Sequence, residues 1–242
     1  MTLFNSKIPN NSRLIKIMNF NSPDAPLCVI TTAQAGSMGK NSSPDHKNRN
    51  KIMDLLGIDK ILCLNQEHTD FVFDSKEIEN NLTGDGIITL EKKVLAVTVA
   101  DCLPIFLYDS KNNAYGIVHS GWKGTGIVLN ALNKMATSYG TKPEDIHIII
   151  GPSIGKCCYS VDKDRASNFA SKWGNNTVIE KDARNLYFLD LKKANKLMLE
   201  NKGVKNITVD ENCTCCTREF HSYRRDSAEG FGLMLALIGY FG

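Results

Sequence analysis

His68, Cys102 and His119 are the residues whose types and positions best suggest chemistry. Each comes directly after a short apolar run typical of a β-strand. These runs are Ile61–Leu64, Val94–Val99 and Tyr115–Val118. Two imidazoles and one thiolate suit Zn²⁺, and three protein ligands leave a fourth position open for water or substrate. The spacings are too long for a zinc finger, and composition alone favours an ordinary buried cysteine and two hydrogen-bonded histidines.

A glycine-rich segment, Gly121–Gly126, stands directly before a run with helical periodicity, Ile127–Tyr139. Backbone N–H groups at such a junction can face an anion, and Lys123 adds a positive charge. The segment matches neither a phosphate-binding P-loop nor a dinucleotide fingerprint. A tight turn that only caps the helix explains it equally well.

Cysteines and arginines gather near the C-terminal end of the sequence. Cys213, Cys215 and Cys216 fall within four residues, and Arg224 and Arg225 follow shortly after. Adjacent thiols rarely all reach one ion and no second pair stands at finger spacing, so the sequence argues against a zinc cluster here. Either arginine could bind phosphate bidentately, or the pair could form an ion pair with the neighbouring carboxylate, Asp226.

Two further adjacent cysteines follow a turn. Gly151-Pro152 ends the apolar run His147–Ile150, and Cys157 and Cys158 come a few residues later. Neighbouring cysteines cannot easily form a disulfide with each other. We expect at least one of them to be buried and unreactive.

Strand-like and helix-like segments are mixed along the chain without a strict βαβ rhythm. Further strands are expected at Leu27–Thr32, Ile87-Ile88, Ile105–Tyr108 and Ile207–Val209, and helices at His46–Leu56, Arg165–Trp173, Leu191–Asn201 and Phe231–Phe241. This pattern predicts a mixed-sheet α/β (α+β) fold. We expect a loosely packed extension over residues 1–26 and one domain over residues 27–242.

Composition excludes several classes of protein. The net charge is only +3 and no basic run exceeds two residues, which argues against a nucleic-acid partner. No apolar stretch approaches a membrane span, and the polar start lacks a signal peptide, so we expect a cytoplasmic protein with no membrane partner. The eight cysteines should then be mostly reduced.

Five segments, in order, resemble one family. They are Gln66-Glu67-His68; Thr98-Val99-Ala100-Asp101-Cys102-Leu103-Pro104; His119-Ser120-Gly121-Trp122-Lys123-Gly124-Thr125; Gly151-Pro152-Ser153-Ile154 with Cys157-Cys158-Tyr159; and Cys213-Thr214 with Ser222-Tyr223-Arg224-Arg225-Asp226. The second has one residue more than the family's T-A-D-C-L-P element. The chain is therefore similar, from about Val29 onward, to the YfiH-type family, also called peptidoglycan editing factors or laccase-domain proteins.

The resemblance implies an α/β/β/α sandwich shared with cysteine hydrolase-like toxins. It implies zinc, rather than copper, on His68, Cys102 and His119, and phosphorolysis of purine nucleosides: adenosine, inosine and methylthioadenosine. Adenosine deamination is a second implied activity. The expected catalytic residues are Asp101, Cys102 and His119. The expected substrate-binding residues, for nucleoside and phosphate, are Gln66, Lys123, Arg224, Arg225 and Arg49.

Two arginines of the family pattern are absent. Ala33 stands where the family has arginine in a T-T-R element, and Phe231 stands where it has arginine after glycine. We therefore expect phosphate binding to be weaker than in relatives or to use other residues.

Three alternatives to the phosphorylase stay open. A copper polyphenol oxidase would need more histidines than the five present. A peptidoglycan-editing quality-control factor would show little nucleoside turnover. A metal-free thiol hydrolase would use Cys102 as nucleophile and His119 as base. Monomer and homodimer are both compatible with the sequence.

Overall fold

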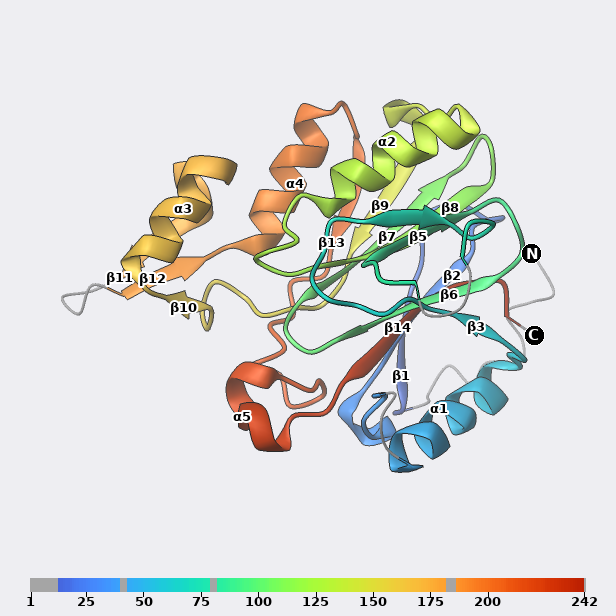
Figure 1. The fold of residues 1–242 in the computed structure, drawn as a ribbon, viewed down its shortest axis with the longest axis horizontal. Coiled ribbons are helices and arrows are strands. Elements are labelled where there is room, and N and C mark those ends of the chain that lie inside the picture. The colour runs from blue at the N-terminus through green and yellow to red at the C-terminus, as the bar shows by residue number, and fades with distance from the viewer. Residues whose placement is uncertain (1–12, 40–42, 79–81, 182–185, 242) are drawn as a thin grey trace.

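Two mixed β-sheets face each other, and helices cover their outer surfaces (Figure 1). The structure is a computed structural model, and it describes residues 13–39, 43–78, 82–181 and 186–241. The layers follow the order helix, sheet, sheet, helix, as expected for an α/β/β/α sandwich.

The larger sheet has six strands in the order β13-β9-β7-β8-β5-β4. Their bounds are β4 Val72–Asp74, β5 Gly86–Thr89, β7 Leu103–Asp109, β8 Ala114–Ser120, β9 Ile146–Ile150 and β13 Asn206–Val209. The strand-like runs Ile105–Tyr108 and Tyr115–Val118 are confirmed as β7 and β8, which form a hairpin and pair antiparallel from Leu103 opposite Ser120 to Asp109 opposite Ala114. Every residue of β7 and β8 is buried, because both faces of this sheet are covered.

The second sheet has five strands in the order β1-β2-β14-β6-β3. Their bounds are β1 Ile15–Met18, β2 Leu27–Thr31, β3 Ile61–Leu62, β6 Val94–Val99 and β14 Met234–Gly239. The prediction of a helix over Phe231–Phe241 is wrong, because this segment contains the central strand β14. All six residues of β14 are buried, and a short apolar run buried on both faces carries no periodicity that separates strand from helix.

Part of the expected N-terminal extension belongs to this sheet. β1 pairs antiparallel with β2, from Ile15 opposite Thr31 to Met18 opposite Cys28. The side chains of Ile15, Met18 and Phe20 are buried, so this part of residues 1–26 is not loosely packed. A four-residue edge strand has a weak pattern, so β1 was not predicted. Residues 1–12 lie outside the described part.

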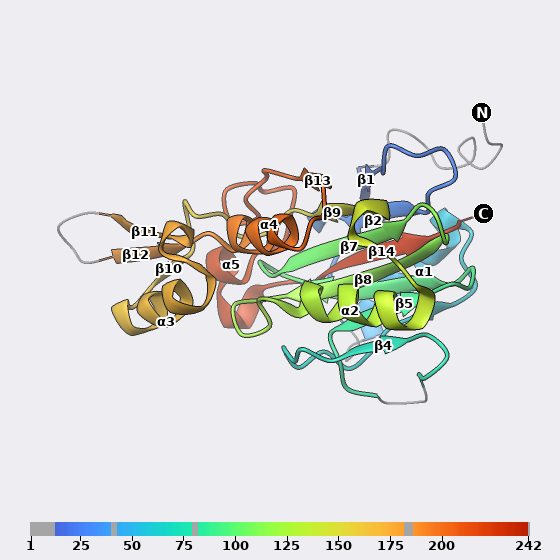
Figure 2. The same cartoon turned by 90° about the horizontal axis from the view of Figure 1, so that it is seen from above.

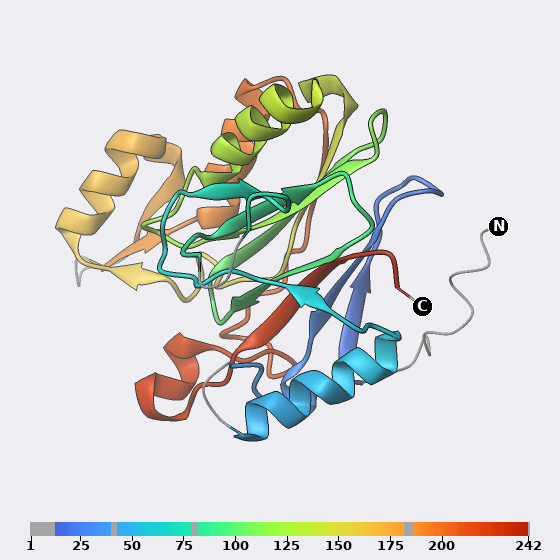
Figure 3. The same ribbon diagram turned by 45° about the vertical axis from the view of Figure 1, so that its right-hand side comes forward.

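Three apolar clusters lie between the layers. One packs the helix α1, Ser43–Leu56, on the five-stranded sheet through Ile52 and Leu56. A second lies between the two sheets, and a third packs α2, Ile127–Tyr139, and α4, Leu191–Asn201, on the six-stranded sheet. Figure 3 shows α1 and the α2/α4 pair on opposite outer surfaces. The helices expected over these segments are confirmed.

A small third sheet extends from one end of the sandwich (Figure 2). It consists of β10 Ser160–Val161, β12 Leu186–Leu189 and β11 Val178–Lys181, in that spatial order. The helix α3, Lys163–Trp173, packs on it and begins with the Asp162 carboxylate accepting the Arg165 N–H. A last short helix, α5 Tyr223–Gly230, directly precedes β14 in the chain. Among the described residues, no helix is long and apolar enough to cross a membrane.

Candidate metal centre

The structure brings His68, Cys102 and His119 together. Their ligand atoms all lie within 4.8 Å of one another, and Cys102 Sγ is 3.8 Å from His68 Nε2. His68 follows β3, Cys102 lies between β6 and β7, and His119 belongs to β8. The three residues were expected to follow strands, and the fold brings these ends of strands from both sheets close together.

Asp85, which sequence reasoning missed, orients two of these ligands. Its Oδ1 lies 2.7 Å from His119 Nδ1, which leaves Nε2 of His119 to face Cys102. Its Oδ2 accepts the backbone N–H of Thr69 at 2.6 Å and the Thr69 hydroxyl at 2.8 Å, next to His68. A carboxylate behind a histidine is a common support for a metal ligand. The only signal in the sequence was an acid between two glycines at the start of a strand.

The backbone at the site is unusual. His68 has φ 59° and Asp101, next to Cys102, has φ 79°. Non-glycine residues rarely adopt this left-handed region, and they occur most often where a site demands it. Gly121 has a steric role, because a Cβ there would come within 2.9 Å of Cys102 Sγ.

Cys102 and His119 shift each other's pKa in opposite directions. Burial opposes ionisation of Cys102, but the nearby His119 charge and hydrogen bonds from both histidines outweigh it and lower the thiol pKa. Burial likewise opposes the charged form of His119, yet the Cys102 thiolate and the Asp85 carboxylate raise its pKa. A thiolate is the form that binds metal, so the site is prepared for a soft divalent ion.

A pocket of about 490 Å³ opens over the three ligands. Its wall carries the aromatic rings of Trp122, Tyr159, Tyr223 and Phe231. Tyr223 and Phe231 meet edge to face with centroids 5.0 Å apart. Rings and a few polar groups around a cavity of this size are typical of a site for a small organic ligand.

Two arginines line this pocket. Arg165 of α3 lies over the Trp122 ring, with the guanidinium carbon 4.6 Å from the ring centroid. Arg224 of α5 donates to the Ser160 carbonyl at 3.0 Å and to the Ser160 hydroxyl at 2.9 Å. Arg165 was missed from sequence, because nothing in its helix distinguished it from a surface residue.

Of the other expected site residues, two line the pocket with their polar groups already engaged. Gln66 Oε1 accepts the Thr98 N–H at 2.7 Å, and its Nε2 donates to the Thr98 carbonyl. Asp101 accepts from the Thr214 hydroxyl at 2.6 Å and from the Arg224 N–H at 2.7 Å. Both side chains therefore fix loops around the ligands.

Three expected phosphate ligands lie elsewhere. Arg225 forms an ion pair with Asp226 and donates to the carbonyls of Thr214 and Phe220. Arg49 donates from Nε to the Met38 carbonyl at 2.7 Å. Lys123 is exposed. None of the three lines the pocket, and the glycine-rich segment itself packs against the loop of His68, with Gly124 beside the Thr69 carbonyl.

The cysteine expectations are partly wrong. Cys157 is exposed and Cys158 only half-buried, because both lie on a turn after β9 and not in the core. The fold places them beside Cys213 and Cys216, a grouping that the separation along the sequence concealed.

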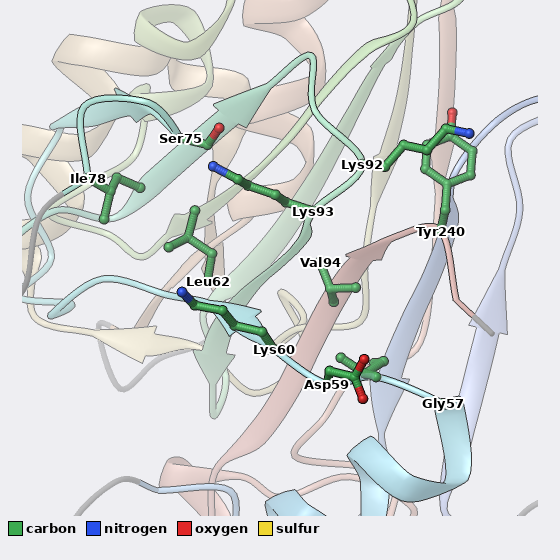
Figure 4. Close-up of a pocket in the computed structure, with 11 residues that line it drawn as sticks. Gly57, Asp59, Lys60, Leu62, Ser75, Ile78, Lys92, Lys93, Val94 and Tyr240 are labelled. Atoms are coloured by element: carbon green, nitrogen blue, oxygen red, sulfur yellow. The ribbon is translucent and has the colours of Figure 1, made fainter.

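A second pocket, of about 470 Å³, lies away from these ligands (Figure 4). Lys60, Lys92 and Lys93 lie around it with Tyr240. Lys93 forms an ion pair with Glu91 at 2.5 Å, and Lys92 lies over the Tyr240 ring. The ammonium groups of Lys93 and Lys92 are therefore already engaged by Glu91 and Tyr240.

A family model described as multi-copper polyphenol oxidoreductase laccase matches residues 35–240. The chain belongs to this family. The resemblance to the YfiH-type, laccase-domain proteins is thereby confirmed. The chain is 32% identical over 216 residues to a purine nucleoside phosphorylase of Clostridium acetobutylicum, covering 86% of this chain and 89% of that one.

Solved structures of this laccase-domain family share the fold. YlmD from Geobacillus stearothermophilus superposes with a TM-score of 0.82 at 29% identity, over 93% of this chain and 96% of that one. The Bacillus licheniformis hypothetical protein YfiH gives 0.78 at 28% identity, over 91% and 98%. The predicted mixed-sheet α/β sandwich is confirmed.

Proposed function

We propose that this chain is a zinc-dependent purine nucleoside phosphorylase. The observation that carries the proposal is one pocket that combines the His68, Cys102 and His119 set with aromatic walls and two arginines. The Clostridium acetobutylicum relative that bears the name of this activity matches most of the chain and supports it.

The donor set fits the implied metal. Two imidazole nitrogens and a thiolate are a common set for catalytic zinc, and the Asp85 contact fixes the tautomer of His119. Bound zinc would supply electrostatic stabilisation of negative charge at the reacting groups. Copper binds similar donors, but a multinuclear copper site needs further histidines. The ligand groups within the described ranges are this one and a group of four cysteines.

In phosphorolysis, a phosphate oxygen forms a bond to C1′ of the ribose while the C1′–N9 bond breaks. The electron pair goes to the purine, which takes up a proton, and ribose 1-phosphate is the second product. Arg165 and Arg224 would hold the phosphate at the pocket wall. They are the arginines available for this role in the pocket, since Ala33 lies outside this lining and Phe231 contributes a ring.

The purine would stack on the rings of Tyr159, Tyr223 and Phe231. Adenosine, inosine and methylthioadenosine share this purine face, so all three are proposed substrates. We assign Asp101 and Gln66 positioning roles, because their side chains are engaged by Thr214, Arg224 and Thr98.

Adenosine deamination in the same pocket would need a carboxylate that is free to carry protons. Asp101, the candidate, accepts hydrogen bonds on both of its oxygens, so this arrangement supports phosphorolysis better. A metal-free hydrolase with Cys102 as nucleophile would keep its activity when the metal is removed.

The test is phosphate-dependent release of hypoxanthine from inosine and adenine from adenosine by zinc-loaded protein. We expect Cys102→Ala to abolish release and Arg165→Ala to reduce kcat/KM on the order of a hundredfold at limiting phosphate. Lys172→Ala, which removes an exposed cation from the same helix, serves as the control.

Other outcomes identify the alternatives. Inosine accumulating from adenosine without phosphate would make the protein a deaminase. Activity that survives a chelator would indicate the thiol hydrolase, and phenol oxidation with copper the oxidase. No turnover of any of these would overturn the proposal in favour of a peptidoglycan-editing or binding role.

A further inference from the structure

A second group of metal-binding side chains lies outside the pocket. The sulfur atoms of Cys157, Cys158, Cys213 and Cys216 all lie within 4.8 Å of one another. Cys158 Sγ is 3.3 Å and Cys157 Sγ is 3.6 Å from Cys216 Sγ. We propose that these four cysteines form a structural site for Zn²⁺, independent of the proposed enzymatic function.

The spacing of the sulfurs suits a tetrahedral ion. With zinc–sulfur bonds of about 2.3 Å, the four sulfurs of a tetrahedron lie about 3.8 Å apart. The two separations from Cys216 are slightly shorter than this value and all four sulfurs lie within 4.8 Å of one another, so small side-chain rotations would close the shell. Cys213 and Cys216 also have the Cys-x-x-Cys spacing that is common in structural zinc sites.

The backbone around the group is shaped for a thiolate. The Gly155 N–H donates to Cys213 Sγ at 3.2 Å, a contact that stabilises negative charge on sulfur. Gly155 also approaches the group closely, because a Cβ there would lie 3.2 Å from Cys157 Sγ and 3.4 Å from Cys213 Sγ.

Positive charge lies close by. Arg224 approaches the Cys158 carbonyl at 3.4 Å, and the buried Lys192 donates to the Asn212 carbonyl, next to Cys213. A zinc ion with four thiolates carries two net negative charges, which these cations would balance. Neither cation lies in the shell itself.

A disulfide explains the group less well. A bond between Cys158 and Cys216 would require their sulfurs to close from 3.3 Å to about 2.05 Å, and it would leave Cys157 and Cys213 without a role. One bound ion would instead use all four thiols as ligands.

The site would join two loops that support the pocket. Cys157 and Cys158 lie after β9, and Cys213 and Cys216 precede α5. Between the latter two, Thr214 holds Asp101, the neighbour of Cys102. Zinc at the four cysteines would therefore fix the loop of Thr214, which holds Asp101 next to Cys102.

The experiment is metal analysis of protein purified under reducing conditions with zinc. We expect two zinc ions per wild-type chain, one in Cys157→Ser/Cys216→Ser, and one in His68→Ala/Cys102→Ala. Cys63→Ser removes a cysteine outside both groups and should keep two. Circular dichroism confirms that each variant is folded.

A second measurement needs no variant. Titration of metal-free wild-type protein with Co²⁺ should bind two equivalents, with thiolate-to-cobalt absorption well above that from one cysteine. A single zinc ion in the wild type that is lost in His68→Ala/Cys102→Ala, an unchanged count in Cys157→Ser/Cys216→Ser, or a Cys158–Cys216 disulfide in the reduced preparation would each overturn the proposal. These readouts do not involve nucleoside turnover, so they are separate from the test of the phosphorylase.

Discussion

Asp85 holds both histidines of the metal centre through one buried carboxylate. One oxygen contacts His119 Nδ1, and the other accepts from Thr69, whose neighbour is His68. Burial opposes ionisation of Asp85, yet the hydrogen bonds from His119 and Thr69 lower its pKa. The carboxylate therefore stays charged at neutral pH and keeps the two ligands aligned.

We expect Asp85→Asn to weaken zinc binding by about ten- to a hundredfold, because the amide supports His119 less well and perturbs the Thr69 turn. Competition with a chromophoric chelator measures the affinity. Asp54→Asn, an exposed carboxylate on α1, is the matched control. Equal affinity in the two variants would refute a supporting role for Asp85.

The lowered pKa of Cys102 predicts its reactivity in metal-free protein. Only the thiolate reacts with iodoacetamide, so alkylation should be fast at neutral pH and slow only as the pH falls through the lowered pKa. The alkylation rate of an ordinary cysteine would instead keep rising as the pH approaches its pKa of about 8.5. Peptide mapping after alkylation at a series of pH values measures this.

Zinc should protect Cys102 from alkylation, because the thiolate becomes a ligand. Cys28 is the internal reference: burial raises its thiol pKa well above the usual value, so it should stay unmodified throughout. A Cys102 profile that matches an ordinary thiol would show that His119 does not stabilise the thiolate.

At the scale of single elements, β14 holds the five-stranded sheet together. It pairs with β2 on one side and with β6 on the other. We expect Leu237→Ala, at a fully buried position, to lower the free energy of unfolding by about 2–5 kcal/mol. Urea denaturation measures the change. Leu90→Ala, at a side chain 43% exposed, should have little effect, and equal losses would count against this role of β14.

Elements with a clear period were predictable from sequence, and β14 was not. The helices α2 and α4 show apolar residues on one face, and the β7–β8 hairpin surrounds a recognisable turn. β14 is a run of five apolar residues followed by Gly239, which suits a buried strand or a helix equally. Pairing with β2 and β6 makes this segment a strand, and both partners are distant in sequence.

The candidate site shows the same division. His68, Cys102 and His119 were predictable, because metal-binding residue types follow strand-like runs and the segments resemble a family. Arg165 and the partners of Cys213 were not, because their positions depend on how α3 and the loop after β9 fold back. Arg225 looked like a phosphate ligand, but its guanidinium is enclosed by carbonyl groups.

At the scale of the whole molecule, the candidate metal centre brings together residues from the two sheets. His68 follows β3 of the five-stranded sheet, whereas His119 belongs to β8 of the six-stranded sheet. An ion that binds only the folded state stabilises it by about 4 kcal/mol at a thousand times its Kd. We expect zinc to raise the Tm of the wild type by several degrees.

The double variant His68→Ala/Cys102→Ala should abolish the part of the Tm increase that comes from zinc at His68, Cys102 and His119. Differential scanning fluorimetry with and without chelator measures the shifts. A wild-type Tm that does not respond to zinc would show that the ion does not link the sheets.

The position of β14 also has a consequence for synthesis. Its partners β2 and β6 are made long before it, yet β14 lies between them in the sheet and pairs with both. Until residue 239 has left the ribosome, each partner has an unpaired edge that can associate with another chain. Completion of the five-stranded sheet during synthesis therefore waits for its central strand, and until then the open edges of β2 and β6 favour association between chains.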